Sequence, residues 1–234
     1  MNDGVLYLYR MKNRLFFAFA AISLLFSLMS FSETGTYQLA VLQYKGGGDW
    51  YSNPSSIPNL VKYCNERLGM NINEEVPFVD VGSRELFNYP LVHMTGHGNV
   101  VLSASDIDNL RAYLQSGGFL HISDNYGMDE FVRPQMRRVF PDLDFIELPF
   151  EHAIYHQQFD FNSGLPKIHE HDNKAPQGLG LIYEGRLVCF YDYECDLGDA
   201  WEDWEVHKDP EALRQKAFEF GANMIQFVMM GEAK

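Results

Sequence analysis

The sequence predicts a single α/β domain built on a largely parallel β-sheet. Short apolar segments alternate with amphipathic segments along the chain, which is the order expected for parallel strands joined by helical crossovers. Residues 91–95 and 119–123 are the most informative pair, because both end in polar residues and one well-capped helix joins them. A right-handed crossover places the carboxyl ends of the two strands at one edge of the sheet, where ligands bind in open α/β folds.

The first half of the predicted domain consists of strands around one helix. Residues 56–68 carry apolar side chains at helical spacing, and Gly69 ends this helix. Strands are expected at residues 37–44, 76–81 and 91–95. The loop that follows the first strand should reach the polar edge of the sheet.

The second half continues the alternation and ends in a hairpin and a helix. Ser103 and Asp106 resemble a capping box at the start of a helix over residues 103–116, and Gly117 ends that helix. The further expected elements are a strand at 119–123, a helix at 129–140, a strand at 143–148, an irregular stretch at 149–176, a hairpin of strands 179–183 and 186–191, and a helix from Asp209 to Met230.

Residues 1–32 have the pattern of a signal peptide or an N-terminal anchor. Lys12 and Arg14 precede an apolar run at residues 15–31, and small residues follow, so cleavage after Ser32 is expected. Met11 is an alternative start. The seventeen residues of this uncharged, mainly apolar run are also at the lower limit for a membrane span. Either way the domain, residues 36–231, is expected to be exported to the periplasm or cell envelope, free or anchored in the inner membrane.

The composition narrows the classes of partner. A formal net charge of −14 disfavours nucleic acid and anionic lipid surfaces, so the expected partner is a small polar ligand or a protein. Contact with the membrane is expected only through an uncleaved N-terminal segment. The three cysteines, Cys64, Cys189 and Cys195, have no spacing typical of a disulfide framework or a zinc knuckle.

Four segments resemble the domain of unknown function 4159 family. They are FNYPLVHMTGHG at 87–98, LRAYLQSGGFLHISDN at 110–125, LPFEHAIYH at 148–156 and GRLVCFYDYECDLGDAWE at 185–202. The resemblance covers residues 36–230. It implies a class I glutamine-amidotransferase-like, flavodoxin-like three-layer sandwich, and it implies no activity.

The superfamily comparison argues against glutamine hydrolysis. Class I amidotransferases carry a nucleophilic cysteine in the turn after the strand that corresponds to residues 119–123. In this chain the turn is Ser123-Asp124-Asn125, and the later His169-Glu170-His171 lies in an irregular stretch. Because nucleophilic catalysis needs an activated nucleophile beside an oriented base, the chain is not expected to be a glutamine amidotransferase.

The two strand tips are the first candidate site. Glycines on either side of His97 allow a ligand to approach the backbone closely, and His97 offers a base, a donor or a metal ligand. The second tip adds Asp124, which would orient His97 if the strands pair. Turn formation alone also explains both tips. The candidate ligand-binding residues here are Gly96, His97, Gly98, Ser123, Asp124, Asn125 and Tyr126.

Other histidines and an acidic segment complete the candidates. A metal site would need His97, Asp124, His152 and His156 to converge. No cofactor is predicted, and a divalent metal is left open. His93 and His121 are expected in the core, whereas His169, His171 and His207 are expected at the surface. Acidic and aromatic residues from Asp192 to Glu205 are interpreted either as a solvated surface loop or as a lip over the edge, with Asp192 and Trp201 as further ligand-binding candidates.

Two functions follow from these patterns. The first is an exported domain that binds a polar small molecule or a protein partner. The alternative is a hydrolase, metal-assisted or based on a histidine–aspartate pair, with His97, Asp124 and His152 as catalytic candidates.

Overall fold

The computed structural model describes residues 36–124, 126–171 and 173–230, all within one compact unit, Thr36–Lys234. The predicted signal segment and Asn125 lie outside the described residues. Within the described part of the chain, no helix combines the length and apolarity needed to cross a bilayer.

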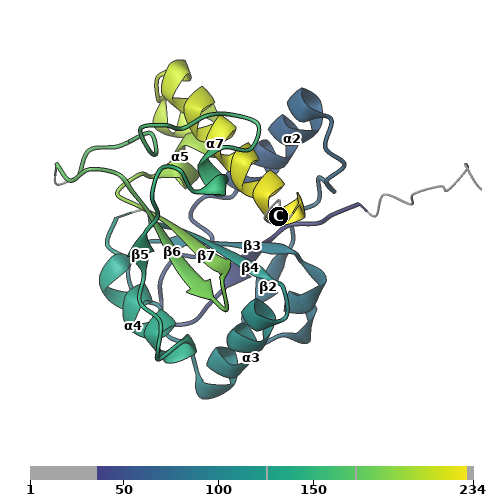
Figure 1. The fold of residues 1–234 in the computed structure, drawn as a ribbon, viewed down its shortest axis with the longest axis vertical. Helices are drawn as coiled ribbons and strands as arrows, with labels where there is room; N and C mark the ends of the chain where they lie inside the picture. Colours follow the sequence, from purple (N-terminus) through teal and green to yellow (C-terminus); the bar gives the residue numbers. More distant parts are fainter. Residues whose placement is uncertain (1–35, 125, 172, 231–234) are drawn as a thin grey trace, which may run out of the picture. The chain divides into compact units, whose positions relative to one another are not determined.

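A seven-stranded, mostly parallel sheet forms the centre of this unit, with the strand order β2-β1-β3-β4-β7-β6-β5 (Figure 1). The strands are β1 (Ala40–Gln43), β2 (Phe78–Asp80), β3 (Leu91–Gly96), β4 (Phe119–Asp124), β5 (Ile146–Glu147), β6 (Gln177–Tyr183) and β7 (Arg186–Tyr193). Neighbours from β2 to β7 run parallel, and β6 is antiparallel to both β5 and β7. The predicted α/β class, parallel sheet and hairpin are therefore confirmed.

Helices cover both faces of the sheet, as Figure 1 shows. Those on one face are α2 (Ser56–Leu68), α5 (Leu197–Trp201) and α7 (Glu211–Met230), and those on the other are α3 (Ala104–Gln115) and α4 (Asp129–Val139). Successive strand side chains enter different cores: Leu39 and Val41 face the first group, and Ala40 and Leu42 the second. This alternation follows from the two-residue repeat of a strand.

Local signals explain where the helices begin and end. Ser103 and Asp106 form the predicted capping box of α3. Gly69 takes a left-handed conformation with φ 64° at the end of α2, a conformation that glycine adopts without strain.

Three segments differ from the sequence prediction. The first strand is shorter than residues 37–44, because the ladders to β2 and β3 together involve only Ala40–Gln43. The irregular stretch contains a 3-10 helix, η2 (Ala153–Tyr155). The expected acidic lip is instead helical, forming α5 and α6 (Trp204–His207). The apolar residues of α5 pack into the core, so Trp201 is fully buried and does not line the surface, whereas Trp204 of α6 is exposed.

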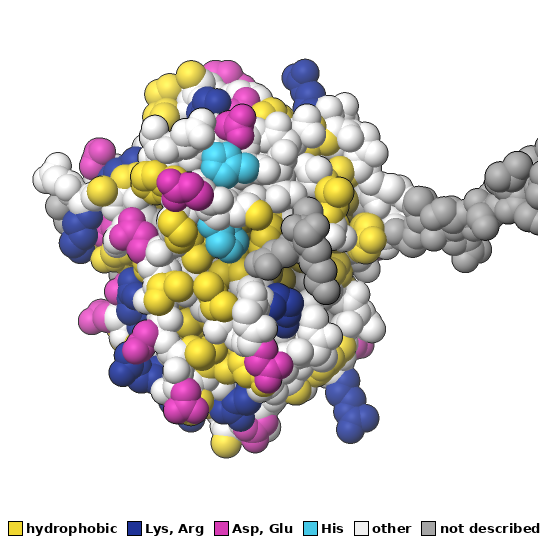
Figure 2. Space-filling model, viewed as in Figure 1, with side chains coloured by type: hydrophobic (Ala, Val, Ile, Leu, Met, Phe, Trp, Pro, Cys, Tyr) yellow, Lys and Arg dark blue, Asp and Glu magenta, His cyan; other side chains and the backbone are white. Residues whose placement is uncertain are grey.

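Charged side chains of both signs are mixed with hydrophobic ones on the face drawn in Figure 2. The acidic side chains therefore do not form a single acidic patch on that face.

Candidate metal centre

Polar residues from β3, β4 and β7 meet at one edge of the sheet. Gly96 pairs with Asp124, and Ser123 pairs with Asp192, so residues at or next to the carboxyl ends of three adjacent strands lie side by side. Ser123 and Asp124 lie on opposite faces because they are consecutive in a strand. Ser123 accepts a hydrogen bond from the backbone N–H of Gly198 in α5, at 3.1 Å.

A cluster of histidines and aspartates lies on the α5 side of this edge. His169 and His171 come from the irregular segment before β6, Asp196 from the turn after β7, Asp199 from α5 and His207 from α6. We call these five residues the histidine–aspartate cluster. Two sets of three ligand atoms lie within 4.8 Å of one another, namely His169, His171 and Asp196, and His169, Asp199 and His207. Imidazole nitrogens and carboxylate oxygens in such sets are typical of transition-metal sites.

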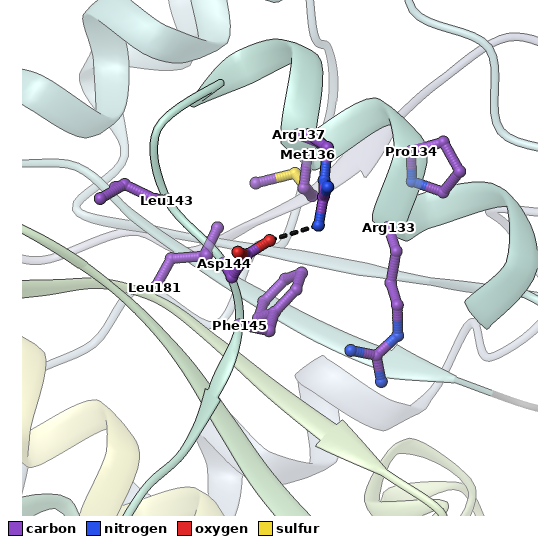
Figure 3. Close-up of a pocket in the computed structure, with 8 residues that line it drawn as sticks. All are labelled: Arg133, Pro134, Met136, Arg137, Leu143, Asp144, Phe145 and Leu181. Carbon is purple, nitrogen blue, oxygen red and sulfur yellow. Dashed lines mark hydrogen bonds and ion pairs between the residues drawn. The ribbon is translucent and has the colours of Figure 1, made fainter.

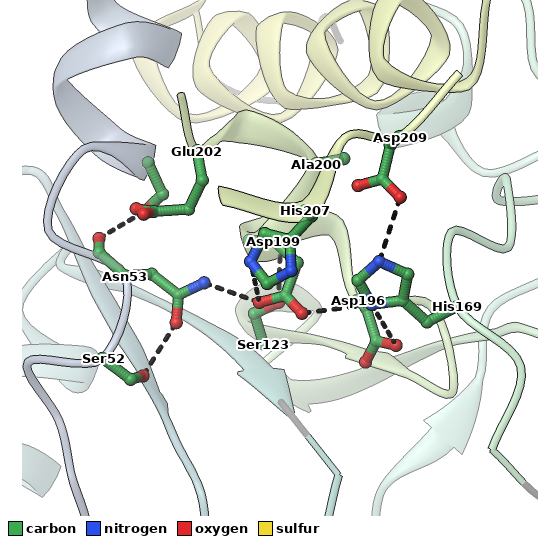
Figure 4. A network of polar contacts seen from close by, with 12 residues as sticks. Ser52, Asn53, Ser123, His169, Asp196, Asp199, Ala200, Glu202, His207 and Asp209 are labelled. Atoms are coloured by element: carbon green, nitrogen blue, oxygen red, sulfur yellow. Dashed lines mark hydrogen bonds and ion pairs between the residues drawn. The ribbon is translucent and has the colours of Figure 1, made fainter. Parts of the chain in front are cut away.

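His169 is the centre of this cluster (Figure 4). Its Nε2 lies 3.1 Å from Oδ1 of Asp209, while its Nδ1 lies 3.2 Å from Asp199 and 3.5 Å from Asp196. Hydrogen bonds to Asp196 and Asp199 raise the pKa of His169 to about 10, although burial opposes this shift. Both ring nitrogens therefore face negative charge.

His171 and His207 approach the cluster from either side. His171 Nε2 lies 2.6 Å from Oδ2 of Asp196, and its ring stacks on Tyr126 with centroids 4.4 Å apart. His207 Nε2 lies 3.8 Å from Oδ1 of Asp199. Asn53 donates to the same Asp199 oxygen at 2.6 Å, which fixes that carboxylate. The side chains of all three histidines, which were expected at the surface, are only partly exposed: those of His169 and His171 are each 25% exposed, and that of His207 is 29% exposed.

Two carboxylate oxygens beside His169 are buried without a hydrogen-bond partner among the described residues: Oδ1 of Asp196 and Oδ2 of Asp209. Leaving a buried polar atom unpaired is costly, so such atoms often mark ion or water positions. Asp196 also has φ 57°, in the left-handed region that disfavours residues with a Cβ atom. Strained backbone at a ligand-rich turn is common in functional sites.

The strand-tip candidates lie at the same edge but have other contacts. His97 Nδ1 lies 3.0 Å from Oδ2 of Asp49, and the His97 side chain is 56% exposed. Asp124 accepts hydrogen bonds from the backbone N–H of Met128 at 2.9 Å and from the hydroxyl of Tyr191 at 3.0 Å. Asp124 thus holds the start of α4. Burial raises its pKa.

His152 lies elsewhere in the fold. Its ring is 5.6 Å from that of Phe227, which in turn packs on Phe119, the first residue of β4. Asp124 is the last residue of β4, so the two lie near opposite ends of a strand roughly 16 Å long. The structure therefore does not bring His152 to His97 and Asp124. His156 pairs with Asp160 at 2.9 Å.

A small pocket of about 230 Å³ opens beside the cluster. Its lining residues are Asp124, Tyr126, Gly127, Asp129, Glu130, Lys174, Tyr193 and Glu194. Because Tyr126 also stacks on His171, the pocket and the cluster share a wall. A larger cavity of about 560 Å³ lies between α4 and the segment before β5, where the Arg137–Asp144 ion pair spans it (Figure 3). No residue of the histidine–aspartate cluster lines that cavity.

One sequence signal pointed to this cluster. His169 and His171 form a His-x-His pair, and alternate residues of an extended segment face the same side. The partners Asp196, Asp199 and His207 follow after an entire hairpin, so only the folded chain brings them to the pair.

The fold and this edge define an α/β domain with a histidine- and aspartate-rich cluster at the carboxyl end of its parallel strands. The model of the family described as Domain of unknown function (DUF4159) matches residues 38–229, and the chain belongs to that family. The resemblance noted in the sequence is thereby confirmed at the level of the family. No curated protein matches the chain.

Proposed function

We propose that this domain binds a divalent transition-metal ion at the histidine–aspartate cluster. The observation that carries the proposal is the orientation of His169, whose Nδ1 faces two carboxylates while Asp209 holds its Nε2. A carboxylate on the far nitrogen of a metal-bound histidine is a recurring arrangement, because it fixes the tautomer and increases the basicity of the coordinating nitrogen.

The competing interpretation is a protonated His169 that only neutralises its neighbours. A ring between three carboxylates needs either two protons or one proton and a cation at Nδ1. The unpaired buried oxygen of Asp196 and the two further histidines favour the cation, since an ion pair alone needs neither.

The donor set indicates which ion to expect. Nitrogen and carboxylate ligands without thiolates suit zinc, iron or manganese. Ligand atoms around tetrahedral zinc are about 3.4 Å apart, given bonds of about 2.1 Å. The spacings of 3.2 and 3.5 Å at His169 Nδ1 are close to this value.

The ion would lie beside the pocket that Asp124 and Tyr126 line, so a polar ligand bound there would be its neighbour. Three protein ligands leave a metal position open, and a metal ion lowers the pKa of water bound at that position. This arrangement favours the alternative function, a metal-assisted hydrolase, in which the histidine–aspartate cluster rather than His152 would supply the metal ligands. His97 and Asp124 stay candidate residues at the same edge. Export through residues 1–32 and the assignment to a class I glutamine-amidotransferase-like, flavodoxin-like fold also stay proposals.

The test is the metal content of the purified full-length chain. We expect one zinc, iron or manganese ion per chain by elemental analysis, and saturable zinc binding after chelation. His171→Gln and His169→Gln should each reduce zinc affinity by at least about 10-fold. His156→Gln is the matched control, because His156 also pairs with an aspartate but belongs to neither set of candidate ligand atoms found among the described residues. Equal zinc binding by all four proteins, or none by the wild type, would overturn the proposal.

A further inference from the structure

Three buried side chains form a hydrogen-bonded chain beside the histidine–aspartate cluster. His93 Nδ1 lies 2.9 Å from His121 Nδ1, and His121 Nε2 lies 3.0 Å from Oδ2 of Asp192. All three residues have no exposed surface. We call them the buried triad. The prediction that both histidines belong to the core is confirmed, but they are joined to an acid rather than isolated.

The triad crosses three adjacent strands. His93 in β3 is the register partner of His121 in β4, and Asp192 is the residue before the last in β7. Trp201 covers both imidazoles, with ring centroids 6.0 and 5.6 Å away. Trp201 belongs to α5, which also carries Asp199, so the triad and the cluster lie on either side of one short helix.

The contacts allow two proton arrangements. With Asp192 ionised, His121 donates from Nε2, His93 donates from Nδ1, and His93 Nε2 keeps a lone pair. With Asp192 protonated, its O–H donates to His121 Nε2, His121 Nδ1–H donates to His93, and His93 Nε2 carries a proton. The second arrangement holds one proton more, and both imidazoles are neutral in each.

The surroundings favour the arrangement with the extra proton. Burial strongly penalises an ionised Asp192, and the carboxylates of Asp196, Asp124 and Asp199 add repulsion, so its pKa is raised well above the ordinary value although Ser123 opposes this. Burial also lowers the pKa of His93 and of His121, which keeps both rings neutral. Asp192 Oδ1 and His93 Nε2 are buried without partners among the described residues.

We propose that the buried triad stores one proton as the carboxylic acid of Asp192, and that it gives this proton up when a divalent cation binds at the histidine–aspartate cluster. This inference rests on the proposed function. Burial is the main reason that Asp192 holds its proton, and a cation that neutralises Asp196 and Asp199 removes the repulsion that these two carboxylates add, so it shifts the pKa of Asp192 downward. The proton on His93 Nε2, which is buried without a partner in the described part of the chain, then reaches solvent through local opening of the fold. The His121 Nδ1 proton moves to His93 Nδ1, and the Asp192 proton moves to His121 Nε2.

Proton release on zinc binding tests the inference. Calorimetry of the metal-free full-length chain in two buffers of different ionisation enthalpy counts the protons released. Asp192→Asn keeps the shape and a donor toward His121 but cannot ionise, so we expect it to release about one proton fewer than the wild type. Asp160→Asn, a change at the exposed partner of His156, should release as many as the wild type.

Infrared spectroscopy of the wild type gives an independent measurement that needs no variant. The metal-free protein should show the band of a protonated carboxyl group, and zinc should abolish it. Equal proton release by Asp192→Asn and wild type, or absence of the band in the metal-free protein, overturns the inference while leaving the metal site intact. Absence of zinc binding overturns the proposed function and, with it, the release step.

Discussion

Oδ1 of Asp209 lies 3.1 Å from Nε2 of His169, and this contact directs Nδ1 of the same ring toward Asp196 and Asp199. Asp209 therefore sets which nitrogen is available to a metal. Asp209→Ala should weaken zinc binding about 10- to 100-fold. Asp209→Asn keeps an acceptor oxygen, so its zinc affinity should lie between those of the wild type and Asp209→Ala. Titration calorimetry measures this. Asp203→Ala is the control, since Asp203 accepts from Asn59 outside the cluster. An unchanged affinity in Asp209→Ala would contradict the assigned role.

The raised pKa of His169 makes the stability of the metal-free protein depend on pH. The pKa is about 10 in the folded chain and 6.5 ordinarily, so the folded state holds the proton more tightly. The stabilisation is fully present below pH 6.5 and is lost as the pH rises to about 10. Urea denaturation with a chelator should show a loss of about 2 kcal/mol or more across this window, since one pKa unit is worth about 1.4 kcal/mol. His169→Gln should remove most of that slope, and an identical slope in the variant would contradict the assignment.

Zinc affinity should change with pH in the opposite direction. The metal competes with the proton on His169 Nδ1, so binding tightens as the pH rises from 6.5 toward 10. The expected slope is about one proton displaced from this ring per ion. Competition with a chromogenic chelator at several pH values measures it, and an affinity that falls with rising pH would count against coordination by His169.

Asn223 holds the loop after η2 against α7. Its Oδ1 accepts from the backbone N–H of Gln158 and of Phe159, both at 2.9 Å, and its Nδ2 donates to the carbonyl of Phe159 at 2.7 Å. Asn223 is fully buried, so Asn223→Ala leaves backbone groups unpaired and should cost about 2–4 kcal/mol in urea denaturation. Zinc affinity should stay within about 3-fold of wild type, because the hydrogen bonds of the Asn223 side chain go to Gln158 and Phe159, which lie outside the cluster. A loss below about 0.5 kcal/mol would show that solvent replaces these bonds.

The fold was predictable because its signals are local. Apolar spacing and Gly69 predict the helix Ser56–Leu68 at its observed bounds, and Ser103 and Asp106 predict the start of α3. The meeting of the β3 and β4 tips follows from crossover handedness and is confirmed by the pairing of Thr95 with Ser123.

The histidine–aspartate cluster was not predictable in the same way. His169 lies in a segment without periodicity, and its partners at 196–209 approach it only after the β6–β7 hairpin has formed. The short helix α5 is fixed by burial of Trp201 rather than by helix propensity, so neither its shape nor the place of Asp199 follows from local sequence.

The substitution Gly221→Ala tests whether packing of α7 against α5 stabilises the histidine–aspartate cluster. A Cβ atom at Gly221 would lie 2.6 Å from Leu60 Cδ1 and 2.9 Å from Trp201 Cζ2, and both neighbours are fully buried. Gly221→Ala improves helix propensity by about 1 kcal/mol, but overpacking against a rigid indole costs about 1–3 kcal/mol. We expect a net loss of about 1–2 kcal/mol in urea denaturation.

The same substitution should also lower the zinc affinity of the proposed metal site. Trp201 and Asp199 share α5, so displacing the indole tilts the helix that carries a ligand. Zinc affinity should fall several-fold in Gly221→Ala and stay unchanged in Gln226→Ala, a substitution on α7 whose side chain contacts Met230 instead. If Gly221→Ala is more stable than the wild type and keeps full zinc affinity, the prediction is wrong. The side chains of Leu60 and Trp201 would then adjust to the added methyl group without displacing α5.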